Sequence, residues 1–219
     1  MAEAYRRHDL LDVEPGAWRA VLAERPDLAD APHVAAWVAD GRPVILRRSH
    51  PGEAPGRVPV GLPLPPGDGK RRIGLALPPE AVRPRRPLHL SDTRHAGPPA
   101  WTETMEAAIA LGERHGLALR PFGSLLWQSL TGLPYLSERS DLDLLWPIAG
   151  AVPPALLDGL AAIEARAPMR LDGEILLTDG GGVNWRELYA AGPGDTVLVK
   201  HRDRLALREA AAILAGDPE

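Results

Sequence analysis

Two stretches of the sequence carry residues that could bind a phosphate and a metal ion. In the first, Gly123 and Ser124 follow the apolar run 117–122, which is suited to a buried strand, and a helix is expected from Leu125. Glycine lets the backbone approach a ligand closely, and the free N–H groups of a helix N-terminus can bind phosphate oxygens together with the Ser124 hydroxyl. Gly123 and Ser124 are therefore candidate phosphate-binding residues.

The second stretch is Asp141-Leu142-Asp143. Side chains two residues apart on a strand point to the same face, so Asp141 and Asp143 are expected to project together. Two adjacent carboxylates repel each other, and a hard divalent cation such as Mg²⁺ allows both to remain ionised. Mg²⁺ also binds phosphates and stabilises the charge that develops when phosphorus is attacked. Asp141 and Asp143 are thus candidate metal ligands and catalytic residues.

Each stretch has an ordinary structural explanation when taken alone. A Gly-Ser pair after a strand is most often a turn, and an Asp-x-Asp pattern is most often a solvated strand end. Here the two occur in order on an expected strand–turn–helix–strand framework. Their combination favours a metal-dependent site that acts on a phosphate ester or anhydride.

Two later segments offer further charged residues. Alternation along the segment 170–174 puts Asp172 and Glu174 on one face, and only one of them need reach the metals; the alternative is a hairpin turn at Asp172-Gly173 with both acids exposed. Lys200 ends an apolar strand, from which it could reach a phosphate as a point charge. A lysine at a strand end is more often simply solvated.

The order Gly-Ser, helix, Asp-x-Asp resembles the nucleotidyltransferase superfamily. That resemblance implies that Asp141 and Asp143 bind metal and that a third carboxylate lies on a later strand. By this analogy we favour Asp172 as general base or second-metal ligand, with Glu174 as the second choice. The segment between Ser124 and Asp141 is longer than in many members of the superfamily, which affects the course of the connecting loop rather than the roles of its ends.

A narrower resemblance covers nearly the whole chain. The sequence is similar to the malonate decarboxylase holo-acyl-carrier-protein synthases, a family of phosphoribosyl-dephospho-coenzyme A transferases. The segments that carry this similarity are 7–11, 58–63, 123–136, 140–145, 170–174 and 197–200.

The resemblance implies a specific reaction. The donor would be 2′-(5″-triphosphoribosyl)-3′-dephospho-coenzyme A, the acceptor a serine of the acyl carrier protein subunit of malonate decarboxylase, and the leaving group diphosphate. The residues themselves support only metal-dependent transfer from a triphosphate, with Mg²⁺ as cofactor. Two alternatives remain: another metal-dependent nucleotidyltransferase acting on a protein or small molecule, and a non-catalytic carrier-binding protein.

Composition excludes several other classes. The 219 residues include 25 basic and 29 acidic side chains, giving a net charge of −4, whereas a nucleic-acid partner calls for a basic face. The absence of cysteine excludes disulfides, a thiolate nucleophile and a zinc–cysteine site. The charged N-terminus does not resemble a signal peptide, and no apolar run approaches the roughly 20 residues that span a bilayer. We therefore expect a soluble, cytoplasmic protein with no membrane or nucleic-acid partner.

Turn-forming residues between Ser91 and Pro99 indicate a boundary between two domains. Residues 1–95 are expected to form a small, irregular α+β domain that binds donor or carrier, with proline-containing strands at sheet edges. Its expected helices are 15–24 and 32–39, and its expected strands are 43–47, 57–62 and 72–77.

Residues 96–219 are expected to form the catalytic domain, a nucleotidyltransferase-like mixed α/β fold. Its expected helices are 101–115, one from residue 125, 153–165, one after an N-cap at Asn184 through Tyr189, and 205–214. Its expected strands are 117–122, 141–146, 169–178 and 196–200.

Basic residues recur along the N-terminal domain, and they could contact a polyphosphate or the acidic surface of a carrier protein. The alternative is a solvated face, which charge runs usually are. The residues concerned are Arg6, Arg7, His8, Arg47, Arg48, Lys70, Arg71, Arg72, Arg83, Arg85 and Arg86.

Overall fold

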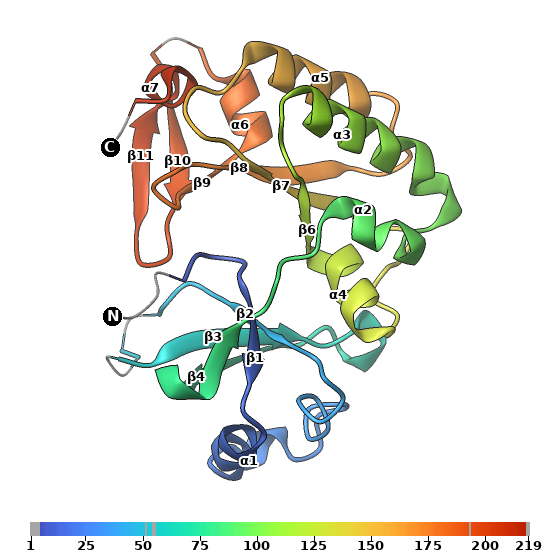
Figure 1. Ribbon diagram of the computed structural model, residues 1–219, viewed down its shortest axis with the longest axis vertical. Coiled ribbons are helices and arrows are strands. Elements are labelled where there is room, and N and C mark those ends of the chain that lie inside the picture. Colours follow the sequence, from blue (N-terminus) through green and yellow to red (C-terminus); the bar gives the residue numbers. More distant parts are fainter. Residues whose placement is uncertain (1–4, 51, 54–55, 193, 218–219) are drawn as a thin grey trace. The chain divides into compact units, whose positions relative to one another are not determined.

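The computed structural model describes residues 5–50, 52–53, 56–192 and 194–217. They form a mixed α/β protein with two sheets (Figure 1), as the sequence predicts. The chain divides into two compact units. The first runs to Pro87 and also contains Leu130–Tyr135, and the second contains Leu88–Ser129 and the chain from Leu136 onward.

The first unit is built on a five-stranded antiparallel sheet in the order β4-β3-β2-β1-β5. Three of these strands confirm predictions, and the other two, of four and three residues, lie where no strand was predicted. The strands are β1 (Leu10–Val13), β2 (Val44–Leu46), β3 (Val58–Pro63), β4 (Arg72–Leu77) and β5 (Val82–Pro84).

Helix α1 (Pro15–Ala23) confirms the first predicted helix, and the Glu14 side chain caps it by accepting a hydrogen bond from Ala17 N at 2.7 Å. The second predicted helix, 32–39, is wrong. This segment is a series of turns, with backbone hydrogen bonds from Val34 N to Ala31 O and from Trp37 N to Val34 O, and His33 at its start has a left-handed φ of 65°. Trp18 on α1 anchors these turns by donating from Nε1 to Val34 O at 3.0 Å.

Strand β3 contains two prolines yet lies inside the sheet, so the expectation that prolines mark edge strands is wrong for it. The Pro59 carbonyl accepts from Arg47 N at 3.1 Å, one residue beyond the end of β2. Because the N and C=O groups of a strand residue point the same way, the missing N–H of Pro59 costs one bond at the end of the β2–β3 ladder and none in the β3–β4 ladder. The second proline, Pro63, ends the strand, and its carbonyl accepts a hydrogen bond from the Tyr135 hydroxyl at 2.8 Å.

Two members of the basic group are already paired within the first unit. The Arg47 guanidinium forms an ion pair with Glu53, and the Arg85 guanidinium with Asp12. These two arginines therefore serve the unit's own structure, whatever the remaining basic residues bind.

The second unit contains a six-stranded sheet in the order β11-β10-β9-β8-β7-β6. Strands β7 and β8 are parallel and are joined through helix α5, and every other neighbouring pair is antiparallel. The strands are β6 (Arg120–Phe122), β7 (Leu142–Pro147), β8 (Leu171–Leu176), β9 (Gly182–Asn184), β10 (Thr196–Lys200) and β11 (Leu205–Glu209).

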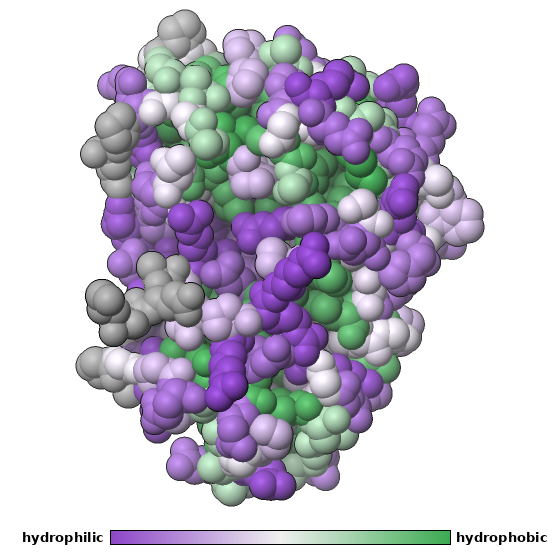
Figure 2. Space-filling view, in the orientation of Figure 1, coloured by the Kyte–Doolittle hydropathy of each residue, from purple (hydrophilic) through white to green (hydrophobic). Residues whose placement is uncertain are grey.

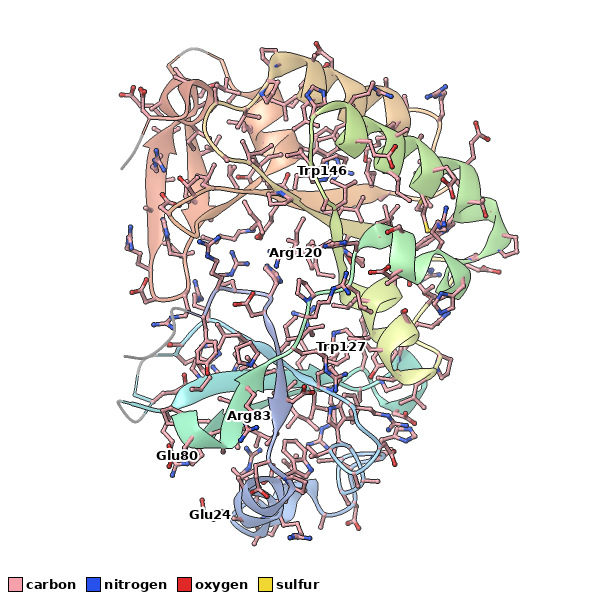
Figure 3. All side chains as sticks on the ribbon, in the orientation of Figure 1. Glu24, Glu80, Arg83, Arg120, Trp127 and Trp146 are labelled. Atoms are coloured by element: carbon pink, nitrogen blue, oxygen red, sulfur yellow. The ribbon has the colours of Figure 1, made fainter. Side chains whose placement is uncertain are left out.

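Helices pack on one face of this sheet, as Figure 1 shows for α3, α5 and α6. The core on that side contains Leu142, Leu144 and Trp146 of β7, which alternate with residues of the opposite face. Trp146 lies on the helix side and Arg120 on the other (Figure 3). The helices are α2 (Leu90–Thr93), α3 (Thr102–Arg114), α4 (Gly123–Thr131), α5 (Pro154–Glu164), α6 (Trp185–Ala190) and α7 (Ala210–Ala215).

The C-terminal segment differs from its prediction. The expected helix 205–214 is a strand, β11, followed by the short helix α7. Leu205 and Leu207 alternate with Ala206 and Arg208, a two-residue period that pairs with β10 along its whole length. Strand β9, three residues long, was also not predicted.

The molecular surface in Figure 2 is largely hydrophilic, with apolar patches among the charged residues of both units. Within the described part of the chain, every helix is too short or too polar to cross a membrane.

Candidate functional site

Pairing of β6 with β7 brings Gly123 next to Asp143. Phe122, the last residue of β6, is the register partner of Asp143, and Gly123 follows it as the first residue of α4. A Cβ atom at position 123 would overlap Asp143 Oδ2 and lie 2.9 Å from its Cγ. The backbone of Gly123 also has φ of +64°, in the left-handed region. Close approach and backbone conformation each require glycine here.

Ser124 is half-buried in the first turn of α4, directly after Gly123. The first N–H groups of a helix have no partners within the helix, so this turn offers donors beside the Asp143 carboxylate. The two halves of the predicted motif, the Gly-Ser turn and the aspartate pair, are therefore neighbours in the folded chain.

The third predicted carboxylate lies on the neighbouring strand. Asp143 of β7 and Asp172 of β8 are register partners in a parallel pair, so their side chains share a face on strands about 4.8 Å apart. Asp141, two residues before Asp143 and just outside β7, is half-buried, as are the other two aspartates. Three carboxylates thus lie at the edge of the sheet where β7 and β8 begin.

The alternative of a hairpin turn at Asp172-Gly173 is wrong, because β8 runs without interruption through both residues. Gly173 serves a different purpose. A Cβ atom there would overlap the carbonyl oxygen of Leu144, so glycine permits the close approach of β7 and β8 beside the aspartates.

Glu174, the second choice for the third carboxylate, has another partner. Its side chain is only 8% exposed, and its Oε1 lies 3.6 Å from Lys200 Nζ. Lys200 on β10 is paired in register with Gly182 of β9, whose missing side chain lets the lysine reach across toward β8. The structure therefore joins Lys200 to Glu174 and leaves Asp172 beside Asp143.

Cations that sequence reasoning did not single out compensate this negative charge. The Arg186 guanidinium binds both Glu164 carboxylate oxygens and lies 3.5 Å from Asp172 Oδ1. The hydrogen bonds to Glu164, and secondarily the charges of Asp172 and Asp141, raise the pKa of Arg186 despite its partial burial. Arg120 of β6, paired in register with Leu145, lies on the same sheet face as Asp143.

Two of the aspartates could act as ligands of a Mg²⁺ ion, although they do not form a closed metal site. Among the residues that the structure describes, no three acidic, histidine or cysteine side chains are grouped so as to hold a metal by themselves. Mg²⁺ seldom uses such a cage, and typically takes one or two carboxylates together with water and substrate phosphates. Asp141 and Asp143, beside a turn suited to phosphate, would supply those carboxylates.

Comparison with known proteins identifies the family of this chain. The family model "Phosphoribosyl-dephospho-CoA transferase MdcG N-terminal domain" matches residues 6–87, and the corresponding C-terminal domain model matches residues 89–211. The chain belongs to the phosphoribosyl-dephospho-CoA transferase family. It is therefore a transferase, as the sequence predicts, and its candidate site residues all fall within the part that matches the family's C-terminal domain.

Relatives named phosphoribosyl-dephospho-CoA transferase match over most of their length. The protein from Bradyrhizobium diazoefficiens is 42% identical over 96% of this chain and 92% of its own. The one from Xanthomonas euvesicatoria is 38% identical, over 94% and 95%. A Pseudomonas putida relative is 34% identical over 88% of each chain. No solved structure matches, so the nucleotidyltransferase-like arrangement of the second unit stays a prediction.

Proposed function

We propose that this protein transfers a phosphoribosyl-dephospho-coenzyme A group from its 5″-triphosphate donor to a serine of the acyl carrier protein subunit of malonate decarboxylase, with release of diphosphate. Family membership supports the nature of the transferred group. The observation that carries the chemistry is the register that sets Gly123, Asp143 and Asp172 side by side.

The proposed reaction is an in-line displacement at the α-phosphorus of the donor. The serine oxygen forms a new P–O bond as the bond to the α,β-bridging oxygen breaks, and diphosphate leaves with that electron pair. The carboxylate of Asp172 accepts the hydroxyl proton and returns it to solvent. The product is a phosphodiester between the serine and the 5″-position of the ribosyl arm.

Other groups in the site would bind and orient the phosphates. The N–H groups at the start of α4 and the Ser124 hydroxyl suit the outer phosphates, and Lys200, held beside Glu174, suits a further phosphate oxygen. Mg²⁺ held by Asp141 and Asp143 would neutralise the charge that develops on the leaving diphosphate. The aspartates supply the ligands, and the glycine turn brings the triphosphate to them.

The direct test is the intact mass of the purified apo-carrier subunit after incubation with this protein, Mg²⁺ and the triphosphoribosyl-dephospho-coenzyme A donor. We expect a gain equal to the phosphoribosyl-dephospho-coenzyme A group, and no gain in a parallel sample with ATP alone. A nucleotide-sized gain with ATP would indicate another nucleotidyltransferase. An unchanged mass in both samples would contradict the proposed acceptor.

The choice between Asp172 and Glu174 predicts unequal effects of two amide substitutions. Asp172→Asn should lower kcat by about 10²-fold, the low end of what a general base contributes. Glu174→Gln should lower it by less than about fivefold, since glutamine keeps the shape beside Lys200 and removes no reacting group. The measurement is kcat of both variants at saturating Mg²⁺. A larger loss of kcat in Glu174→Gln than in Asp172→Asn would make Glu174 the third carboxylate.

A further inference from the structure

The Asp172 carboxylate is held through one of its two oxygens. Oδ1 accepts from Gly173 N at 2.8 Å and Asn184 Nδ2 at 3.0 Å, and Arg186 Nη1 lies 3.5 Å away. Among the described residues, the charged partner of Oδ2 is Arg170 Nη2 at 3.6 Å, on a side chain that is 58% exposed. Oδ2 therefore keeps more of its hydrogen-bonding capacity for a substrate than Oδ1 does.

Two of the groups at Oδ1, the side chains of Asn184 and Arg186, come from the start of helix α6 and are themselves fixed. Arg186 Nη2 donates to Leu171 O at 2.6 Å, and Trp185 Nε1 donates to the same carbonyl at 3.2 Å. The Arg186 guanidinium also stacks on the Trp185 ring, 5.1 Å from its centroid, and binds Glu164 at the end of α5. The backbone just before Asp172 is thus tied to α6, and the helix cannot shift without moving the carboxylate.

Asn184 links the helix to the carboxylate through its two amide atoms. Its Oδ1 accepts from Arg186 N at 3.0 Å and Glu187 N at 3.3 Å, which is the N-cap of α6 that the sequence predicts. With the oxygen fixed by these two N–H groups, Nδ2 is directed at Asp172. Serine or aspartate could form the cap equally well, but neither offers an amide donor in addition.

We infer that Asn184 is a positioning residue for the transfer reaction. It uses the cap of α6 as a fixed base from which to hold Asp172 Oδ1, so that Oδ2 faces the acceptor hydroxyl. The effect of Asn184 on catalysis rests on the proposed function. The hydrogen bond between Asn184 and Asp172 does not depend on any substrate.

The kinetic test is a double-mutant cycle between positions 184 and 172. Asn184→Ser keeps a good cap and loses the amide donor. We expect it to lower kcat about tenfold, with KM for the triphosphate donor changed by less than twofold. In an Asp172→Ala background the same substitution should change the residual rate by less than twofold, because its effect passes through the missing carboxylate. Asn184→Asp, which sets a second carboxylate against Asp172, should be slower than Asn184→Ser.

A tenfold loss that recurs unchanged in the Asp172→Ala background would overturn the inference, because Asn184 would then act through the fold alone. Urea unfolding of the four proteins of the cycle (wild type, Asn184→Ser, Asp172→Ala and the double variant) tests the contact without any substrate. Asn184→Ser should lower the unfolding midpoint more in the wild-type background than in Asp172→Ala. Equal shifts in both backgrounds would overturn the inference even in an active enzyme. If the shifts are unequal as expected but the wild-type protein modifies no carrier, the contact is real and the proposed function is refuted.

Discussion

Replacing Asp143 with asparagine is expected to lower the rate of carrier modification by at least about 10³-fold, because charge stabilisation by a bound divalent cation is worth several kcal/mol. Asparagine has the same size and keeps an oxygen near Gly123, but it lacks the negative charge that draws Mg²⁺. The fold should persist, since Asp143 is half-buried and the core on the other face of β7 is unchanged. Removing one of three neighbouring carboxylates also relieves repulsion.

The measurement is kcat for carrier modification as a function of Mg²⁺ concentration, followed by intact mass. Asp141→Asn should behave like Asp143→Asn, and Asp158→Asn, an exposed position on α5 of the same unit, should match the wild type. Thermal unfolding of each variant checks the fold. Turnover near the wild-type rate in a folded Asp143→Asn protein would remove Asp143 from the site.

The local part of the site can be predicted from the sequence. Gly123, Ser124, Asp141 and Asp143 lie within one strand–helix–strand segment, and short-range rules on glycine turns and strand alternation are enough to bring them to one face. The contact between Gly123 and Asp143 then follows from the antiparallel pairing of β6 and β7, two strands close together in the chain.

The position of Asp172 beside Asp143 depends on long-range register, which the sequence does not specify. Parallel pairing of β7 with β8 places α5 between them, and a shift of one residue would turn Asp172 toward the helices. The sequence could therefore not exclude a hairpin at Gly173. In the folded chain that glycine accommodates the Leu144 carbonyl.

The residues that support Asp172 were missed for a related reason. Asn184 was predicted only as a helix cap, and Arg186 carries no motif, because their second partners lie 12 and 14 residues away along the chain. The edge strand β11 lies in a segment for which the sequence predicts a helix; its alternating leucines are 51% and 70% exposed, so the alternation marks no buried face, and the strand is defined by its pairing with β10. Tertiary contacts determine both the partners of Asp172 and the strand conformation of β11.

The second large effect is expected from Gly123→Ala. The new methyl group would collide with the Asp143 carboxylate and force either that side chain or the start of α4 to move. Displacement of a catalytic group by about 1 Å can cost about 10²-fold, and loss of a backbone donor to the transition state costs a similar factor. We therefore expect kcat to fall about 10³-fold, together with weaker Mg²⁺ dependence.

Gly116→Ala provides the matched control. Gly116 has φ of +68°, almost the same as the +64° of Gly123, but a Cβ atom there would meet nothing within 4 Å. Both substitutions carry the cost of about 1–2 kcal/mol for alanine in a left-handed conformation, and only Gly123→Ala also disturbs the carboxylate. Urea unfolding and carrier modification measured on both variants separate the two effects. Equal activities at matched stability would show that the Gly123–Asp143 contact is dispensable, and the phosphate would then have to bind elsewhere than at the start of α4.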